Sequence, residues 1–213
     1  ADKAYARGWT GKGAVLGVID TYQQTDHEAL DGKYKWYKNY VLNNTIVENR
    51  GQYQSHGTHV AGIIAGKKDG NEFHGVAYDA ELVGANVDFY GNGSANLGQA
   101  QNALHDIAKL KAKKSDGGEG INLVAVNMSF NRNIQFNHYG TIKKLDDGTY
   151  SSSVITANKE SANYWKVGTD NDIVLVNSAG NGMMIDGEVS TEFALDPGIW
   201  ATKVDTNGNL VLG

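Results

Sequence analysis

Residues 14–19 read Ala-Val-Leu-Gly-Val-Ile, and Asp20 follows them directly. An apolar run of this length, without polar alternation, fits a β-strand that is buried on both faces. Three further runs have the same character, at residues 81–87, 123–128 and 173–178. Because helical patterns lie between these runs, we expect four parallel strands of one sheet.

Two helices are expected between the strands. Leu97 to Lys111 repeats apolar residues with a helical period and ends in a lysine-rich turn, which is favourable at the negative end of a helix. Residues 56–66 form the second helix, with Ser55 as its N-cap. Its small residues are expected to keep the face toward the sheet thin: Gly57, Ala61, Gly62, Ala65 and Gly66. A shorter helix is expected over residues 153–167.

This alternation predicts an α/β fold with three layers, in which a mostly parallel twisted sheet carries helices on both faces. At 213 residues the chain is expected to form a single domain, residues 1–213. Ligand sites of such folds lie beyond the carboxyl ends of the strands. Polar residues occupy those ends: Asp20, Asn127 with Ser129, and Ser178 leading to Asn181.

The composition excludes several classes of function. Lys and Arg total 19 against 24 Asp and Glu, so there is no basic footprint for nucleic acid or for an anionic membrane. The absence of cysteine excludes disulfides, thiolate metal sites and a catalytic thiol. Because no apolar run approaches the length of about 18 residues that a spanning helix needs, we expect no membrane span.

Two side chains near the start of the chain could carry chemistry. Asp20 ends an apolar strand, where a carboxylate could orient an imidazole, although aspartate also ends strands as an ordinary turn residue. His56 lies in the first turn of its expected helix. His56 and His59 could instead ligate a metal ion, but that site needs a third ligand, and no Cys or His-Glu spacing supplies one.

A third candidate lies after the last apolar strand. Asn181 stands between Gly180 and Gly182, and its amide could donate a hydrogen bond to a developing oxyanion. An asparagine between glycines is also typical of a turn that needs left-handed backbone geometry. The residue alone does not decide between these interpretations.

Together these elements resemble the subtilisin-like serine peptidase family. The family places its aspartate at the end of an apolar strand, as at Val18-Ile19-Asp20-Thr21, and its oxyanion asparagine in Ala-Gly-Asn, as at residues 179–181. Its histidine block, Ser-His-Gly-Thr-His-Val-Ala-Gly, is reproduced letter for letter at residues 55–62. The likeness covers roughly residues 8 to 205, in the family's order.

The resemblance implies a serine endopeptidase that cleaves polypeptides by acyl transfer. In that mechanism His56 would be the general base, Asp20 would orient it, and Asn181 would stabilise the oxyanion. Two backbone rails would grip the substrate as an added strand: Gly93 with Ser94, and Ser129, Phe130 and Asn131. The resemblance also implies a secreted or cell-surface location, and a pro-peptide as a possible partner.

The family's nucleophile motif, Gly-Thr-Ser-Met-Ala, does not occur in this sequence. Ser190 is the one serine beyond Asn181, and it lacks the neighbours and the distance that the family requires. We therefore expect a C-terminally incomplete domain that is inactive by itself, with the serine on a part outside this chain. The family's usual glycine two places after its aspartate is Tyr22 here.

The chemistry requires no cofactor, but family members often bind structural calcium after the histidine helix. Asp69 and Asn71 are weak candidates there, since two lysines accompany them. A non-catalytic subtilisin-like binding or structural domain is the alternative function. A nucleotide-binding α/β protein is disfavoured, because no Gly-x-Gly-x-x-Gly follows the first strand.

Overall fold

The computed structural model describes most of the first 130 residues and parts of the rest: residues 1–40, 55–70, 73–88, 97–130 and 166–178, with four short strands between 183 and 211. The chain divides into two compact units. One comprises residues 1–129 and 167–176, and the other comprises residues 130–166 and 177–213. The single domain expected from the sequence stays a prediction.

A five-stranded sheet, in the order β2-β3-β1-β4-β5, lies at the centre of the first unit. Its strands are β1 (Val15–Asp20), β2 (Tyr34–Asn39), β3 (Glu81–Asn86), β4 (Leu123–Met128) and β5 (Val174–Asn177). Strand β1 pairs in parallel with β3 and with β4, and β2 pairs in parallel with β3. The four predicted strands are therefore present, each within one residue of its expected ends.

Strand β2 was not predicted. Its sequence, Tyr-Lys-Trp-Tyr-Lys-Asn, is polar, and none of its residues is fully buried. It lies at an edge of the sheet, where charged residues such as lysine are typical. The signal that reveals buried strands, a continuous apolar run, is therefore missing from it.

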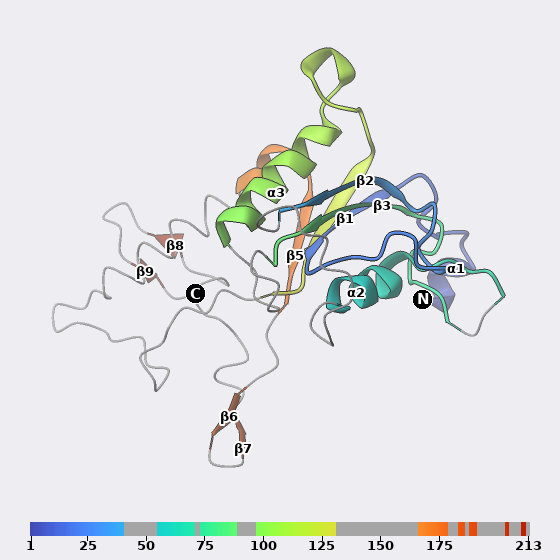
Figure 1. Cartoon of the computed structure of the whole chain (residues 1–213), viewed down its shortest axis with the longest axis horizontal. Coiled ribbons are helices and arrows are strands. Elements are labelled where there is room, and N and C mark those ends of the chain that lie inside the picture. Colours follow the sequence, from blue (N-terminus) through green and yellow to red (C-terminus); the bar gives the residue numbers. More distant parts are fainter. Residues whose placement is uncertain are drawn as a thin grey trace. The chain divides into compact units, whose positions relative to one another are not determined.

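Helices pack on the two faces of the sheet (Figure 1). Helix α2 (His56–Ala65) packs Ala61 and Ala65 into a core with Val18 and Leu82. Helix α3 (Leu97–Lys111) lies across the other face, and it buries apolar residues at helical spacing: Ala100, Ala103, Leu104, Ile107 and Ala108. The three-layer α/β fold and both helices expected from the sequence are confirmed.

One detail of α2 differs from the prediction. Gly57, Ala61 and Ala65 are buried, as expected for the thin face of the helix. Gly62 is not on that face, since a Cβ added there would meet no atom within 4 Å. With 3.6 residues per turn, positions 57, 61 and 65 align, and position 62 turns away from them. Ser55 holds the N-cap position, but its side chain makes no capping hydrogen bond.

The remaining elements are short: α1 (Asp2–Tyr5), the 3₁₀ helix η2 (Lys114–Asp116), a helical turn at residues 166–170, and the strands β6 (Met183–Ile185), β7 (Glu188–Ser190), β8 (Lys203–Val204) and β9 (Leu210–Val211). The helix expected over residues 153–167 lies outside the described residues, apart from its last two. Strand β8 pairs antiparallel with β9 in a two-stranded sheet of their own.

Lys38 of the edge strand β2 and the following Tyr40 both contact Asp106 of α3. Asp106 Oδ2 lies 2.7 Å from Lys38 Nζ and accepts a hydrogen bond of 2.7 Å from Tyr40 Oη. Lys38 Nζ also lies over the Tyr40 ring, 4.5 Å from its centroid. Partial burial opposes ionisation of Asp106, but hydrogen bonds from Lys38 and Tyr40 hold the pKa of its carboxyl below the ordinary value.

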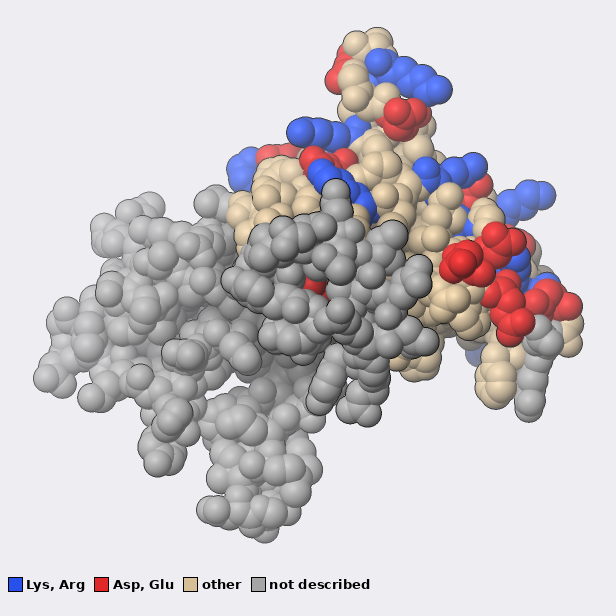
Figure 2. All heavy atoms as spheres, in the orientation of Figure 1, with Lys and Arg blue, Asp and Glu red and all other residues tan. Residues whose placement is uncertain are grey.

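Charged side chains of both signs lie on the described surface (Figure 2). On the face drawn in Figure 2, basic and acidic side chains are interspersed, and acidic ones gather near its right edge. Among the described residues, no helix is both long and apolar enough to cross a membrane.

Candidate active site

Two elements far apart in sequence bring Asp20 and His56 together. Asp20 is the last residue of β1, and His56 is the first residue of α2. Nδ1 of His56 lies 2.7 Å from Oδ1 of Asp20. The Asp20 side chain is 2% exposed, whereas the His56 side chain is 48% exposed. The pair thus joins a buried carboxylate to an imidazole that solvent and a substrate can reach.

Among the described residues, hydrogen bonds reach one of the two carboxylate oxygens of Asp20. The backbone N–H of Thr21 donates to Oδ1 at 2.7 Å, so this oxygen serves both the amide and the imidazole. The second oxygen, Oδ2, is buried and has no hydrogen-bond partner within the described part of the chain. A buried carboxylate with an orphaned oxygen is costly, and such exceptions cluster where a protein does chemistry.

The carboxylate changes the acid–base behaviour of the imidazole. The hydrogen bond from His56 to Asp20, aided by the negative charge of that carboxylate, raises the pKa of His56 above 6.5, although partial burial opposes the shift. Because Nδ1 is committed to Asp20, Nε2 is the nitrogen left for exchanging a proton with another group. This arrangement suits a general base whose tautomer is fixed.

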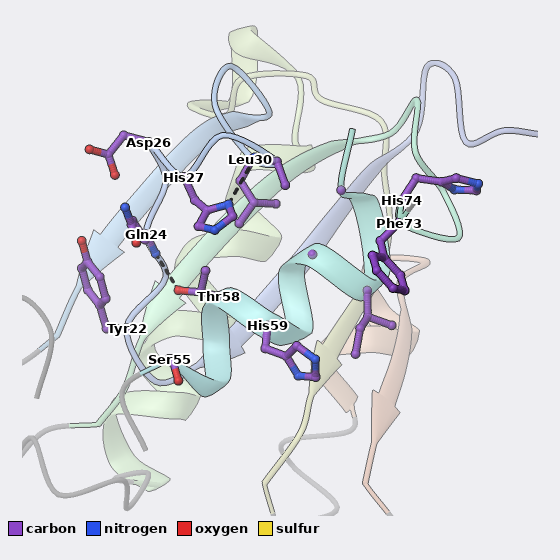
Figure 3. Close-up of a pocket in the computed structure, with 14 residues that line it drawn as sticks. Tyr22, Gln24, Asp26, His27, Leu30, Ser55, Thr58, His59, Phe73 and His74 are labelled. Carbon is purple, nitrogen blue, oxygen red and sulfur yellow. Dashed lines mark hydrogen bonds between the residues drawn. The ribbon is translucent and has the colours of Figure 1, made fainter. Parts of the chain in front are cut away.

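The turn after Asp20 is bonded to the first turn of α2. The Gly57 N–H donates to Thr21 Oγ1 at 2.9 Å, and the Gln24 N–H donates to Thr58 Oγ1 at 2.9 Å. Figure 3 draws the second of these bonds as a dashed line. A Cβ on Gly57 would lie 2.4 Å from the Thr21 carbonyl oxygen, so only glycine allows this approach.

Strand β4 ends at the same edge of the sheet. Its register with β1 sets Ile19 opposite Met128, so Asp20 and Ser129 are the next residues along this edge. Asn127 donates a hydrogen bond of 2.8 Å to the hydroxyl of Ser129. Ser129 and Phe130 are half-buried. The structure does not describe the other predicted site residues: Gly93, Ser94, Asn131 and Asn181.

The candidate calcium site is described only in part. Asp69 is exposed after α2, and Asn71 lies outside the described residues. Lys67 of the same segment lies 3.6 Å from Asp31, and Lys68 lies over the ring of Tyr78. Within the described ranges, no three His, Asp or Glu side chains are grouped so that they could hold a metal ion. Asp69 by itself does not make a calcium site.

A pocket of about 970 Å³ lies on the outer side of α2. Thr58, His59 and Ile63 line it from the helix, and Tyr22 and Phe73 line it from the neighbouring segments (Figure 3). Neither Asp20 nor His56 belongs to its lining. The two histidines of the block therefore face different surroundings, His56 the carboxylate and His59 the pocket.

Comparison with known proteins agrees with this geometry. The sequence profile described as the Subtilase family matches residues 11–207. The chain belongs to this family. Subtilases are serine peptidases, so the resemblance drawn from the histidine block is confirmed. The match also includes most of the segments that the structure leaves undescribed.

Individual subtilases are similar to the chain over parts of their length. It is 41% identical over 108 residues to an extracellular serine protease of Serratia marcescens, which covers 50% of this chain and 10% of that protein. It is 30% identical over 183 residues to the minor extracellular protease Vpr of Bacillus subtilis, which covers 79% of this chain and 20% of that protein.

A solved structure shares the fold. The crystal structure of a cold adapted subtilisin-like serine proteinase matches with a TM-score of 0.51 and 21% identity, over 82% of this chain and 49% of that one. The chain thus spans about half of that protein, and a fifth or less of the two extracellular proteases.

The sequence patterns did not reveal the polar residues that bond the turn after Asp20 to the sheet and to α2. Thr21, Gln23 and Thr58 were not singled out, because a polar residue in a turn has no pattern of its own. The substitution of Tyr22 for the family's glycine marked this turn as unusual. It did not indicate that the side chain of the next residue, Gln23, is buried.

Proposed function

We propose that this chain supplies the Asp–His part of a serine endopeptidase that hydrolyses peptide bonds by acyl transfer. The observation that carries the proposal is the 2.7 Å contact between Nδ1 of His56 and Oδ1 of Asp20 at the carboxyl edge of the sheet. Membership of the subtilase family and the serine proteases among its relatives support the same chemistry.

The proposed mechanism assigns one role to each group. His56 Nε2 takes the proton of a serine hydroxyl while the serine oxygen bonds to the peptide carbonyl carbon. The same nitrogen then gives that proton to the leaving amine as the carbon–nitrogen bond breaks, and water repeats the sequence on the acyl-enzyme. Asp20 fixes the tautomer of His56 and stabilises the imidazolium. Asn181 donates to the oxyanion.

The serine is proposed to lie outside residues 1–213, since no Gly-Thr-Ser-Met-Ala motif occurs among them. The substrate is a polypeptide chain, which the backbone of Gly93 and Ser94 and of Ser129 to Asn131 binds in extended form. We also propose that the protein is secreted, because two of its relatives bear the word extracellular in their names.

A serine-directed fluorophosphonate probe tests the proposal on the full-length protein. We expect labelling of the wild type at a serine beyond residue 213, mapped by mass spectrometry, and loss of labelling in His56→Ala. His59→Ala is the matched control, since this histidine lies three residues along the same helix and faces the pocket. It should label as the wild type does.

Three results would contradict parts of the proposal. Undiminished labelling of His56→Ala would remove the general base from its assigned residue. A label on Ser190 would show that the nucleophile lies within this chain. A folded wild type that binds a peptide but never labels would instead support the non-catalytic alternative.

A further inference from the structure

Gln23 is a fully buried polar side chain in the turn after Asp20, with 0% exposure. Its amide nitrogen donates to the carbonyl oxygens of Val18 at 3.1 Å and Ala85 at 3.2 Å. Its side-chain oxygen accepts a hydrogen bond of 2.8 Å from Tyr34 Oη. Its backbone N–H donates to Tyr37 Oη at 3.1 Å. One side chain thus joins β1, β3 and the edge strand β2.

The two tyrosines keep their protons over the working range of pH. Burial raises the pKa of Tyr34 and the pKa of Tyr37 well above the ordinary value. The hydroxyl of Tyr34 therefore remains a donor to Gln23. Both protons of the Gln23 amide and its oxygen are in use, so this buried polar group is fully satisfied.

Neighbouring residues pack closely around the side chain of Gln23 on two sides. A Cβ on Gly84 would lie 2.4 Å from the side-chain oxygen of Gln23 and 2.8 Å from the ring of Tyr34. On the other side, a Cβ on Gly57 would lie 3.0 Å from Cγ of Gln23. The side chain therefore fills the space between β3 and the residue that follows His56.

We propose that Gln23 is a positioning residue, which holds His56 against Asp20 by locking residues 21–24 onto the sheet. The same turn is bonded to α2 through Thr21 with Gly57 and through Gln24 with Thr58. Asp20 is fixed by β1, and the imidazole is fixed by the start of α2. The turn links these two elements, and Gln23 is its anchor.

The physical reason for this role is the effect of losing the hydrogen bonds that Gln23 makes. An apolar side chain of equal length would remove one donor from the Val18 carbonyl, one from the Ala85 carbonyl and the acceptor of the Tyr34 hydroxyl, and losing such bonds inside the protein is costly. The turn would move to let water or a new donor reach them. Because Gly57 touches the turn directly, the start of α2 would move with it, and the contact between Nδ1 and Oδ1 would lengthen.

Histidine-ring NMR on this chain tests the inference without any need for catalysis. The variant Gln23→Met keeps the side-chain length and removes its hydrogen bonds. We expect the pKa of His56 to fall toward 6.5 and the low-field resonance of its ring N–H to move upfield. The chain holds six histidines, and the variant His56→Gln assigns the resonance.

Tyr40→Phe is the matched control. It removes one tyrosine hydroxyl bond, to Asp106 on α3, and α3 lies on the face of the sheet opposite to α2. We expect it to lower the melting temperature and to leave the His56 pKa unchanged. Equal shifts of that pKa in Tyr40→Phe and Gln23→Met would overturn the inference, because the effect would then follow stability alone.

A milder variant covers the case in which Gln23→Met does not fold. Tyr34→Phe removes only the donor to the Gln23 oxygen, and we expect a smaller shift of the His56 pKa in the same direction. A folded Gln23→Met or Tyr34→Phe with the wild-type pKa and ring N–H resonance would overturn the inference.

The catalytic meaning of the inference rests on the proposed function. In the full-length protein we expect Gln23→Met to slow fluorophosphonate labelling by about tenfold, since small displacements of a catalytic group cost that much or more. If the wild type never labels, the proposed function fails, while the NMR comparison still decides whether Gln23 positions His56.

Discussion

Oδ1 of Asp20 meets Nδ1 of His56 at 2.7 Å, while Oδ2 of the same carboxylate is buried without a hydrogen-bond partner among the described residues. The two oxygens thus have different surroundings. Because Oδ1 already serves two donors, any change of charge or shape at position 20 acts on the imidazole and on the buried oxygen at once.

The variant Asp20→Asn separates these two effects. Its carbonyl oxygen can take the place of Oδ1, and its NH₂ group then lies buried at the position of Oδ2, which has no hydrogen-bond partner among the described residues. We expect a loss of roughly 1–3 kcal/mol in the free energy of unfolding, measured with urea. The pKa of His56 should fall toward 6.5, because the negative charge is gone.

Asp26→Asn is the control for this experiment, since Asp26 is an exposed carboxylate six residues further on. It should leave both quantities unchanged. A His56 pKa that stays at its wild-type value in Asp20→Asn would show that the carboxylate does not act on the imidazole as the geometry indicates.

The raised pKa of His56 predicts how stability depends on pH. The folded chain binds a proton at this site more tightly than the unfolded chain does, so the pair stabilises the fold fully below pH 6.5. This contribution is lost as the pH rises from 6.5 through the higher pKa of the folded state. The sign is therefore a fall in the free energy of unfolding with rising pH.

His56→Gln should remove this dependence. We expect the difference in unfolding free energy between wild type and variant to be larger at pH 5.5 than at pH 9, as urea titrations at both values would measure. Acidic groups elsewhere affect both proteins alike, so the difference isolates position 56. A constant difference across the range would contradict the assigned pKa shift.

Two glycines of α2 give a matched test of packing. In Gly57→Ala the new Cβ would lie 2.4 Å from the Thr21 carbonyl oxygen and 2.7 Å from the Tyr22 carbonyl oxygen. Both are backbone atoms, so the helix start must move, and we expect a loss of about 1–3 kcal/mol in stability. Gly62→Ala meets no atom within 4 Å, and the helix propensity of alanine should stabilise it by up to about 1 kcal/mol.

Thermal denaturation compares these two variants directly, since they change the same residue type in one helix. Opposite shifts of the melting temperature are expected. Equal shifts would mean that α2 does not approach the turn as closely as the structure shows.

The contact of Tyr40 and Lys38 with Asp106 predicts a stability effect far from the candidate site. Tyr40→Phe should lower the free energy of unfolding by roughly 1 kcal/mol, the usual value of a hydrogen bond of this kind. Its effect should shrink at acidic pH, because the lowered pKa of Asp106 means that this stability is lost as the carboxylate is protonated. Lys109→Ala, whose Nζ lies 4.0 Å from Asp106, should change stability much less.

Local pattern was enough to predict most of the fold of the first unit. The signal of the apolar runs that became β1, β3, β4 and β5 lies in consecutive residues. The expected burial on both faces was wrong for β5, where Val174 and Val176 are exposed. The period of Leu97 to Lys111 likewise predicted α3 with its observed ends. The edge strand β2 was not predicted, because its polar residues follow no such pattern.

The sequence by itself determined that Asp20 stands at the end of a strand and that His56 stands at the start of a helix, since each follows from a local pattern. Only the tertiary structure decided that Gln23 enters the core and that Tyr34 and Tyr37 meet it there. Such contacts join residues 11 to 62 positions apart, and they depend on the register of β1, β2 and β3. A register is a property of several strands packed together, which no single stretch of sequence specifies.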